Sequence, residues 1–242
     1  SVGALPDSVT NAGDYTFRNQ VTASFEGAFL SEFAQKRLNA SSAALIYVKN
    51  DYGIGVKEGF KKAWLDSGGT VLLEEASETT DKDYRAQIAK IKSANADIVF
   101  AIPEFQGLFI KQAKELGLNK PLLFIQTFQT PETLVAAGEA ADGALYSYPL
   151  DDTKLTMQQE EFINKFQQKY NYIPQVYSLM SYDALTILVN LIKKCNKDAA
   201  CIKDELYKIQ DYEGVEGTLS FDENGDVIKE LVIKTVKNGE FI

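Results

Sequence analysis

The chain has 242 residues, of which 45% are hydrophobic and 24% charged, as is typical of a globular protein. Its 25 basic and 34 acidic residues give a formal net charge of −9, which argues against nucleic acid as a partner. The chain has no histidine, which excludes zincin motifs and Ser-His-Asp or Cys-His catalysis, so we expect no enzyme, metal or cofactor.

Short β-rich runs alternate with amphipathic helical runs over the first 150 residues. They predict strands at 43–48, 70–76, 97–102, 122–125 and 143–147. They predict helices at 53–67, 84–94, 106–116 and 131–137. Successive strands begin roughly 22 to 27 residues apart, a spacing that suits right-handed βα units. This region is predicted to be a doubly wound α/β domain with a parallel sheet.

After Pro149 the pattern changes. Helices are predicted at 158–170, 175–194 and 199–209. Strand-like runs follow at 217–221 and 231–236, separated by a glycine-containing turn. These helices have no parallel sheet of their own to cover. The region is therefore predicted to be part of a second α/β domain that is incomplete in this chain. No apolar run approaches the roughly 20 residues that cross a bilayer.

The two cysteines, Cys195 and Cys201, lie between two of these predicted helices. Their spacing does not fit a CxxC redox motif, and two cysteines without histidine cannot form a structural zinc site. Two interpretations remain open at this point. The cysteines form a disulfide, which would place the chain outside the reducing cytosol, or they are two unpaired thiols.

Six segments carry a family resemblance. They are Gly13–Arg18, Leu45–Gly55, Lys111–Gly117, Gly138–Gly143, Ser181–Ala184 and Gly217–Gly225. In this order, over roughly 210 residues, they resemble the leucine/isoleucine/valine-binding protein family, the extracytoplasmic solute-binding components of ABC importers. The resemblance implies a type I periplasmic binding fold, periplasmic or extracellular localisation, and a membrane permease as partner. The alternative function is an extracellular ligand-sensing domain of a receptor.

By this resemblance, residues 17–147 and 229–242 form lobe 2, and residues 1–16 and 148–228 form the carboxyl-side part of lobe 1 with the hinge crossings. Family members begin with a further part of lobe 1, so we expect this chain to start after it. Its first residues also lack the basic and apolar runs of an export signal. The lobe-1 helices should then expose apolar faces, and we expect the chain to self-associate through them.

The resemblance also implies a small-molecule ligand bound between the lobes by hinge closure. In an open parallel sheet, ligands bind beyond the carboxyl ends of the strands. The candidates there are Asp51, Tyr52, Glu104, Phe105, Thr127, Phe128 and Gln129. A further candidate, by resemblance, is Tyr177 on a lobe-1 helix.

Some of these candidates have a second interpretation. Asp51 is either a ligand contact or a helix N-cap, and Glu104 is either a partner for a ligand ammonium or a solvated loop acid. Amino-acid-binding relatives often carry an acidic residue where this chain has Phe128 and Gln129. The expected ligand is therefore a branched-chain amino acid or a related amide or aromatic carboxylate.

Overall fold

The computed structural model describes residues 1–3, 7–151 and 153–242. The chain folds into two compact units. Unit 1 contains residues 1–22 and 149–232, and unit 2 contains residues 23–148 and 233–242. The chain therefore passes from one unit to the other after residues 22, 148 and 232.

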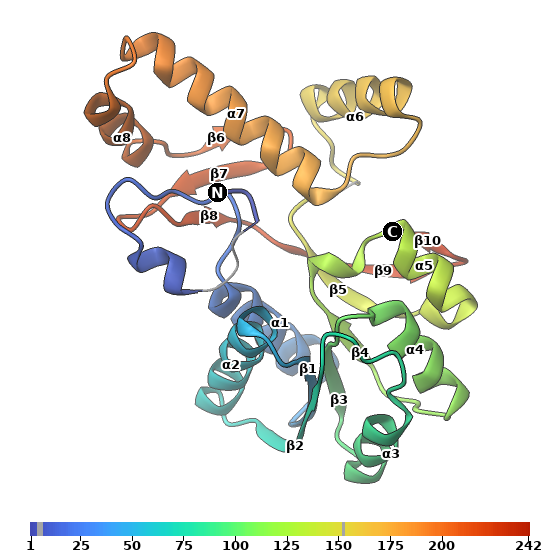
Figure 1. The fold of residues 1–242 in the computed structure, drawn as a ribbon. Coiled ribbons are helices and arrows are strands. Elements are labelled where there is room, and N and C mark those ends of the chain that lie inside the picture. The colour runs from blue at the N-terminus through green and yellow to red at the C-terminus, as the bar shows by residue number, and fades with distance from the viewer. Residues whose placement is uncertain (4–6, 152) are drawn as a thin grey trace. The chain divides into compact units, whose positions relative to one another are not determined.

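A seven-stranded sheet forms the centre of unit 2 (Figure 1), in the order β10-β9-β5-β4-β3-β1-β2. Its strands are β1 (Ser42–Val48), β2 (Thr70–Ser77), β3 (Ile98–Ile102), β4 (Leu122–Phe124), β5 (Leu145–Tyr148), β9 (Val232–Lys237) and β10 (Glu240–Phe241). Strands β1 to β5 pair in parallel, whereas β10 pairs antiparallel with β9. The five strands predicted before residue 150 are confirmed, each within two residues.

Helices lie on both faces of this sheet. They are α1 (Ala23–Leu38), α2 (Asp51–Asp66), α3 (Arg85–Ala94), α4 (Gln106–Glu115) and α5 (Pro131–Ala137), with the short 3-10 turns η2 (Gln126–Phe128) and η3 (Gly138–Ala141). The chain moves outward from β1 to β2 and then back past β1 to β3, β4 and β5. Right-handed crossovers then put α2 on one face and α3, α4 and α5 on the other, which makes the domain doubly wound as predicted.

Helix α1 was not predicted, because its buried face carries no apolar stripe. The buried positions are Ala23, Glu26, Gly27, Leu30, Ser31 and Ala34. They follow helical spacing but include a carboxylate, a hydroxyl and a glycine. The face instead suits a close approach to α2. A Cβ added to Gly27 would lie 2.3 Å from the backbone nitrogen of Phe60, and one added to Gly59 would lie 2.5 Å from Cα of Ser24.

The described part of unit 1 contains three α-helices, a 3-10 helix and a small antiparallel sheet. The elements are the 3-10 helix η1 (Asp7–Asn11), α6 (Met157–Tyr170), α7 (Val176–Lys194), α8 (Ala199–Tyr207) and the strands β6 (Tyr212–Glu213), β7 (Thr218–Phe221) and β8 (Val227–Lys229). The three predicted helices are confirmed. The predicted strand at 231–236 corresponds to β9, which joins the sheet of unit 2, and β8 precedes it.

Helix α7 is apolar on more than one face. Val176, Leu179, Met180 and Ile187 are buried, whereas Tyr182, Leu185, Leu188, Val189 and Ile192 are exposed. A disulfide between Cys195 and Cys201, with an S–S distance of 2.03 Å, joins the end of α7 to α8. No helix in the described part of the chain is long and apolar enough to cross a membrane.

Candidate functional site

The carboxyl ends of β1, β3 and β4 lie at one edge of the unit 2 sheet, because these strands are parallel neighbours. Each end leads into a helical element. Helix α2 begins at Asp51 after β1, α4 begins at Gln106 after β3, and η2 follows β4. This is the edge at which open parallel sheets bind ligands. The fold therefore brings together three loops that are far apart in sequence.

Three polar side chains from these loops form the strand-end cluster, which consists of Tyr52, Gln106 and Thr127. The hydroxyls of Tyr52 and Thr127 are 3.1 Å apart and share a hydrogen bond. Nε2 of Gln106 donates to the same Thr127 hydroxyl at 2.9 Å. Tyr52 and Thr127 are half-buried, and Gln106 is 8% exposed. The cluster offers hydroxyl and amide groups for hydrogen bonding and holds no activated nucleophile.

The amide oxygen of Gln106 is a buried acceptor that lacks a hydrogen-bond donor among the described residues. A buried polar atom without a partner costs free energy, so its presence at a strand end is consistent with a site for a polar ligand. Gln106 was not among the predicted ligand contacts. The loop after β3 was predicted correctly, but the contacts predicted on it are the two preceding residues.

Asp51 is the first residue of α2, and it does not cap the helix. The N-cap is Asn50, whose side-chain oxygen accepts a hydrogen bond from the backbone N–H of Gly53 at 2.8 Å. The N-cap interpretation of Asp51 is therefore wrong, and its exposed carboxylate remains available to a ligand. Gly53 is required by close packing, because a Cβ at this position would lie 2.1 Å from the carbonyl oxygen of Val48.

Glu104 and Phe105 occupy the loop that precedes α4. Glu104 is exposed, and Phe105 is half-buried. The backbone N–H of Phe105 donates to the Tyr84 hydroxyl at 3.1 Å, and the Lys82 ammonium lies 5.4 Å from the centre of the Phe105 ring. Burial raises the pKa of Tyr84 to about 12, so its phenol stays protonated and holds the loop over the whole neutral range.

Phe128 packs in the core of unit 2, which corrects the expectation that its ring faces a ligand. The side chain is fully buried, and its ring stacks on Phe124 with 4.3 Å between centroids. Gln129 is half-buried, and its side-chain oxygen accepts a hydrogen bond from the Tyr146 hydroxyl at 2.8 Å. The loop after β4 thus presents Thr127 to the strand-end cluster and uses Phe128 to anchor itself.

A buried carboxylate that contacts this loop was not predicted from the sequence. Glu26 of α1 is 0% exposed and accepts hydrogen bonds from the backbone and side chain of Gln126 and from the Ser147 hydroxyl. Burial raises the pKa of Glu26, and these hydrogen bonds oppose the shift. The spacing of small and polar residues on α1 is the only sequence signal for this position.

The comparison with known families settles the relationship suggested by the six segments. Residues 2–240 match the family model for periplasmic binding proteins. The chain belongs to this periplasmic binding protein family. The resemblance predicted from sequence is confirmed.

Individual relatives support the assignment. The leucine-, isoleucine-, valine-, threonine- and alanine-binding protein of Pseudomonas aeruginosa is 27% identical over 228 residues, which are 92% of this chain and 60% of that protein. A leucine-binding protein of Thermotoga maritima has a TM-score of 0.89 and 27% identity, covering 96% of this chain and 68% of its own. A branched-chain amino acid binding protein of Streptococcus pneumoniae, solved with isoleucine, has a TM-score of 0.88 and 26% identity, covering 99% and 70%.

These matches establish the fold of this periplasmic binding protein as the type I fold predicted above. The chain spans about 60% of the length of the curated relatives it matches. The relatives are named as binding proteins. The strand-end cluster lies at the edge of the seven-stranded sheet of unit 2.

Tyr177 belongs to unit 1 and lies in the first turn of α7. Its side chain is 41% exposed and lines a groove of about 740 Å³ between α6 and α7. The groove is lined mostly by aromatic rings and lysines, among them Phe162, Phe166, Lys165 and Tyr182. Unit 1 of this periplasmic binding protein thus has an aromatic surface of its own, which includes Tyr177.

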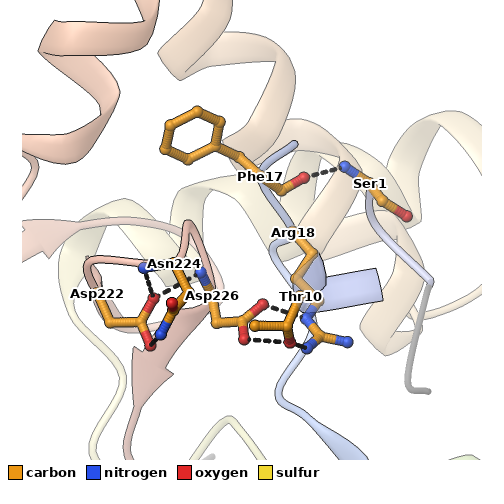
Figure 2. Close-up of polar contacts among 7 residues, drawn as sticks. All are labelled: Ser1, Thr10, Phe17, Arg18, Asp222, Asn224 and Asp226. Atoms are coloured by element: carbon orange, nitrogen blue, oxygen red, sulfur yellow. Dashed lines mark hydrogen bonds and ion pairs between the residues drawn. The ribbon is translucent and has the colours of Figure 1, made fainter. Parts of the chain in front are cut away.

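Two buried polar clusters in unit 1 join the two chain segments that lead into unit 2 at residues 22 and 232. Figure 2 shows the first, in which Nε of Arg18 pairs with Asp226 at 2.5 Å and the Thr10 hydroxyl donates to the same carboxylate at 2.6 Å. In the second, the Lys229 ammonium lies 2.7 Å from Glu216 and 3.0 Å from Oδ1 of Asn19. Burial raises the pKa of Glu216 to about 7 and lowers that of Lys229.

Proposed function

We propose that this chain is the ligand-binding part of an extracytoplasmic solute-binding protein that serves an ABC importer. The observation that carries the proposal is the strand-end cluster, where Tyr52, Gln106 and Thr127 converge from three adjacent parallel strands. It lies at the edge where this class of sheet binds ligands, in a family whose named relatives bind branched-chain amino acids. The proposed location is the periplasm or the extracellular space, and the proposed partner is a membrane permease.

The proposed ligand is a branched-chain amino acid or a related amide or aromatic carboxylate. Hydroxyl and amide groups of the strand-end cluster suit the polar end of such a molecule, and the exposed carboxylates of Asp51 and Glu104 suit an ammonium. We propose further contacts from Phe105 and Gln129, and from Tyr177 of unit 1. Binding with closure about the three connecting segments needs no covalent chemistry.

Thermal unfolding of the chain with L-leucine, L-isoleucine, L-leucinamide and benzoate tests this proposal. A ligand at 100 times its dissociation constant should add about 2.7 kcal/mol to the free energy of unfolding. Tyr52→Phe and Thr127→Val should each reduce the stabilisation, because they remove the shared hydrogen bond. Thr70→Val, which changes an exposed threonine where β2 begins, should leave it unchanged. Stabilisation that survives both cluster variants would contradict the site.

We also propose that a second copy of the chain covers the exposed face of α7. Tyr182, Leu185, Leu188, Val189 and Ile192 form a stripe at helical spacing, and an exposed apolar stripe of this kind favours association. Light scattering at tens of micromolar should give a dimeric mass, and the double variant Leu185→Lys with Ile192→Lys should give a monomeric one. A monomeric mass for the unchanged chain would contradict this proposal.

A further inference from the structure

Glu26 makes contacts that a helix residue does not need for its own helix. It lies in the first turn of α1, where a carboxylate interacts favourably with the helix dipole even when it is exposed. Here the side chain is fully buried and reaches residues 100 and 121 positions later in the chain. Burying a carboxylate is costly unless hydrogen-bond donors surround it. The donors that Glu26 meets therefore indicate what it does.

The three donors to Glu26 come from the turn after β4 and from β5. Oε1 of Glu26 accepts from the backbone N–H of Gln126 at 3.1 Å and from the Ser147 hydroxyl at 2.5 Å. Oε2 accepts from the side-chain amide of Gln126 at 3.3 Å. Gln126 is the first residue of η2, and the preceding N-cap, Ile125, provides no side-chain cap. Glu26 thus supplies, from another helix, the acceptor that the first N–H of this turn lacks.

We infer that Glu26 is a positioning residue for the ligand site, because it fixes the turn that presents the Thr127 hydroxyl to Tyr52 and Gln106. Thr127 follows Gln126 directly, so anchoring the backbone of Gln126 sets where the Thr127 side chain can reach. Glu26 and the buried ring of Phe128 hold the turn on the side of the core, and Thr127 holds it through its hydrogen bonds to Tyr52 and Gln106. The role at a ligand site rests on the proposed function, whereas the anchoring of the turn does not.

The hydrogen-bond pattern distinguishes two substitutions of Glu26. In Glu26→Gln the remaining oxygen can still accept from both the Gln126 N–H and Ser147, because these two donors share one oxygen. The new NH₂ group can donate to Oε1 of Gln126, which is buried and lacks a donor among the described residues, once the Gln126 amide is reversed. Glu26→Met keeps the length of the side chain but leaves all three donors without an acceptor.

Backbone hydrogen exchange of the 242-residue chain tests the anchoring. Glu26→Met should raise exchange at residues 126–130 at least tenfold, while the amides of β1 and β3 keep their wild-type rates. Glu26→Gln should exchange as the wild type does. Ser31→Ala, which changes another buried polar residue on α1, is the matched control and should also leave residues 126–130 unchanged. A uniform rise across unit 2, or identical behaviour of the Met and Gln variants, would overturn the inference.

Ser147→Ala covers the case in which Glu26→Met does not fold. It removes one donor on the same oxygen and should raise exchange in the same segment by a smaller factor. Unchanged exchange at residues 126–130 in this variant would also overturn the inference.

Titration with L-isoleucine separates the inference from the proposed function. Glu26→Met should weaken binding at least tenfold, and Glu26→Gln should stay within about twofold of the wild type. If the wild type does not bind L-isoleucine, the proposed function fails for this ligand, and hydrogen exchange still decides the role of Glu26 in the turn. If Glu26→Met mobilises the turn but binds L-isoleucine as the wild type does, the positioning role is wrong and the proposed function stands.

Discussion

The two units are stabilised by different interactions. Unit 2 buries stacked aromatic rings between a parallel sheet and helices on both faces, with Phe60 lying 4.3 Å from Phe100 and 5.4 Å from Trp64 between ring centroids. Unit 1 leaves one face of α7 exposed and instead buries ion pairs, such as Lys229 with Glu216. Unit 2 is therefore stabilised mainly by its aromatic core, with Glu26 as a local hydrogen-bond anchor, whereas unit 1 relies more on buried ion pairs that hold its connecting segments.

The largest expected effect is the loss of a core ring in unit 2. Phe60→Ala should lower the free energy of unfolding by about 3–5 kcal/mol, because it leaves a cavity beside Trp64 and Phe100. The matched change in unit 1, Phe162→Ala, should cost about 1 kcal/mol, because that ring is only half-buried against Tyr182. Urea unfolding followed by circular dichroism measures both. Equal costs would contradict the comparison.

The buried ion pair of unit 1 is the next test. Lys229→Met should cost about 3 kcal/mol at pH 8, because it leaves the Glu216 carboxylate buried without its cation. This loss of stability in Lys229→Met should become smaller as the pH falls toward 5. In the wild type, Lys229 opposes the effect of burial and the pKa of Glu216 is about 7 in the folded chain, against a reference value of 4.5. Removing Lys229 raises this pKa further, so the variant gains more relative stability than the wild type as the pH falls, because its folded state takes up the proton at a higher pH.

Two variants control for this effect. Glu216→Gln combined with Lys229→Met should recover much of the stability and remove the part of the pH dependence that comes from Glu216, because that carboxylate is no longer present. Lys194→Met breaks an ion pair whose lysine is 62% exposed and should change stability by less than about 1 kcal/mol. A cost for Lys229→Met no larger than that for Lys194→Met would show that the buried pair does not stabilise unit 1.

The disulfide provides a separate test of unit 1, because it lies there while Trp64, the single tryptophan of the chain, lies in unit 2. Cys195→Ser with Cys201→Ser should lower stability by about 2 kcal/mol on the chain-entropy model for so short a loop. The loss should appear in the circular dichroism of the helices. Trp64 fluorescence should keep its wild-type midpoint if unit 2 unfolds by itself, and a matching shift in both signals would show that the two units unfold together.

The sequence was most informative where burial follows a simple period. Strands such as Ile98–Ile102 are apolar throughout and bounded by turns, so their positions and their parallel pairing could be predicted. Helix α1 could not, because Gly27 and Glu26 on its buried face serve a close contact and a hydrogen-bond network rather than an apolar core. Nothing local in the sequence signals contacts to residues 100 positions away.

The candidate site shows the same division. The strand-end rule located all three loops, and Tyr52 and Thr127 meet there as a hydrogen-bonded pair. Side-chain direction was harder to predict. Phe128 turns into the core, Asn50 rather than Asp51 caps α2, and Gln106 joins the cluster although it lies one residue beyond the predicted contacts. Loop position follows from topology, whereas side-chain direction depends on packing between loops.

The smallest expected effect concerns a carboxylate at the surface of unit 2. Asp97 accepts hydrogen bonds from the backbone N–H groups of Ser41 and Ser42, both at 2.9 Å, and these bonds lower its pKa to about 2 from 3.8. Because the folded-state pKa is the lower one, this stabilisation is present above pH 3.8 and is lost as the pH falls through 2.

Asp97→Asn should therefore cost no more than about 1 kcal/mol at pH 7, since the group is exposed and solvent screens it, and should cost nothing below pH 2. Unfolding of the variant and the wild type between pH 2 and 7 measures the difference, with Asp66→Asn, which breaks an exposed i,i+4 pair, as the control. A cost well above 1 kcal/mol at pH 7 would mean that an exposed charged group contributes as much to unit 2 as buried polar contacts do to unit 1. Aromatic packing would then no longer distinguish the two units.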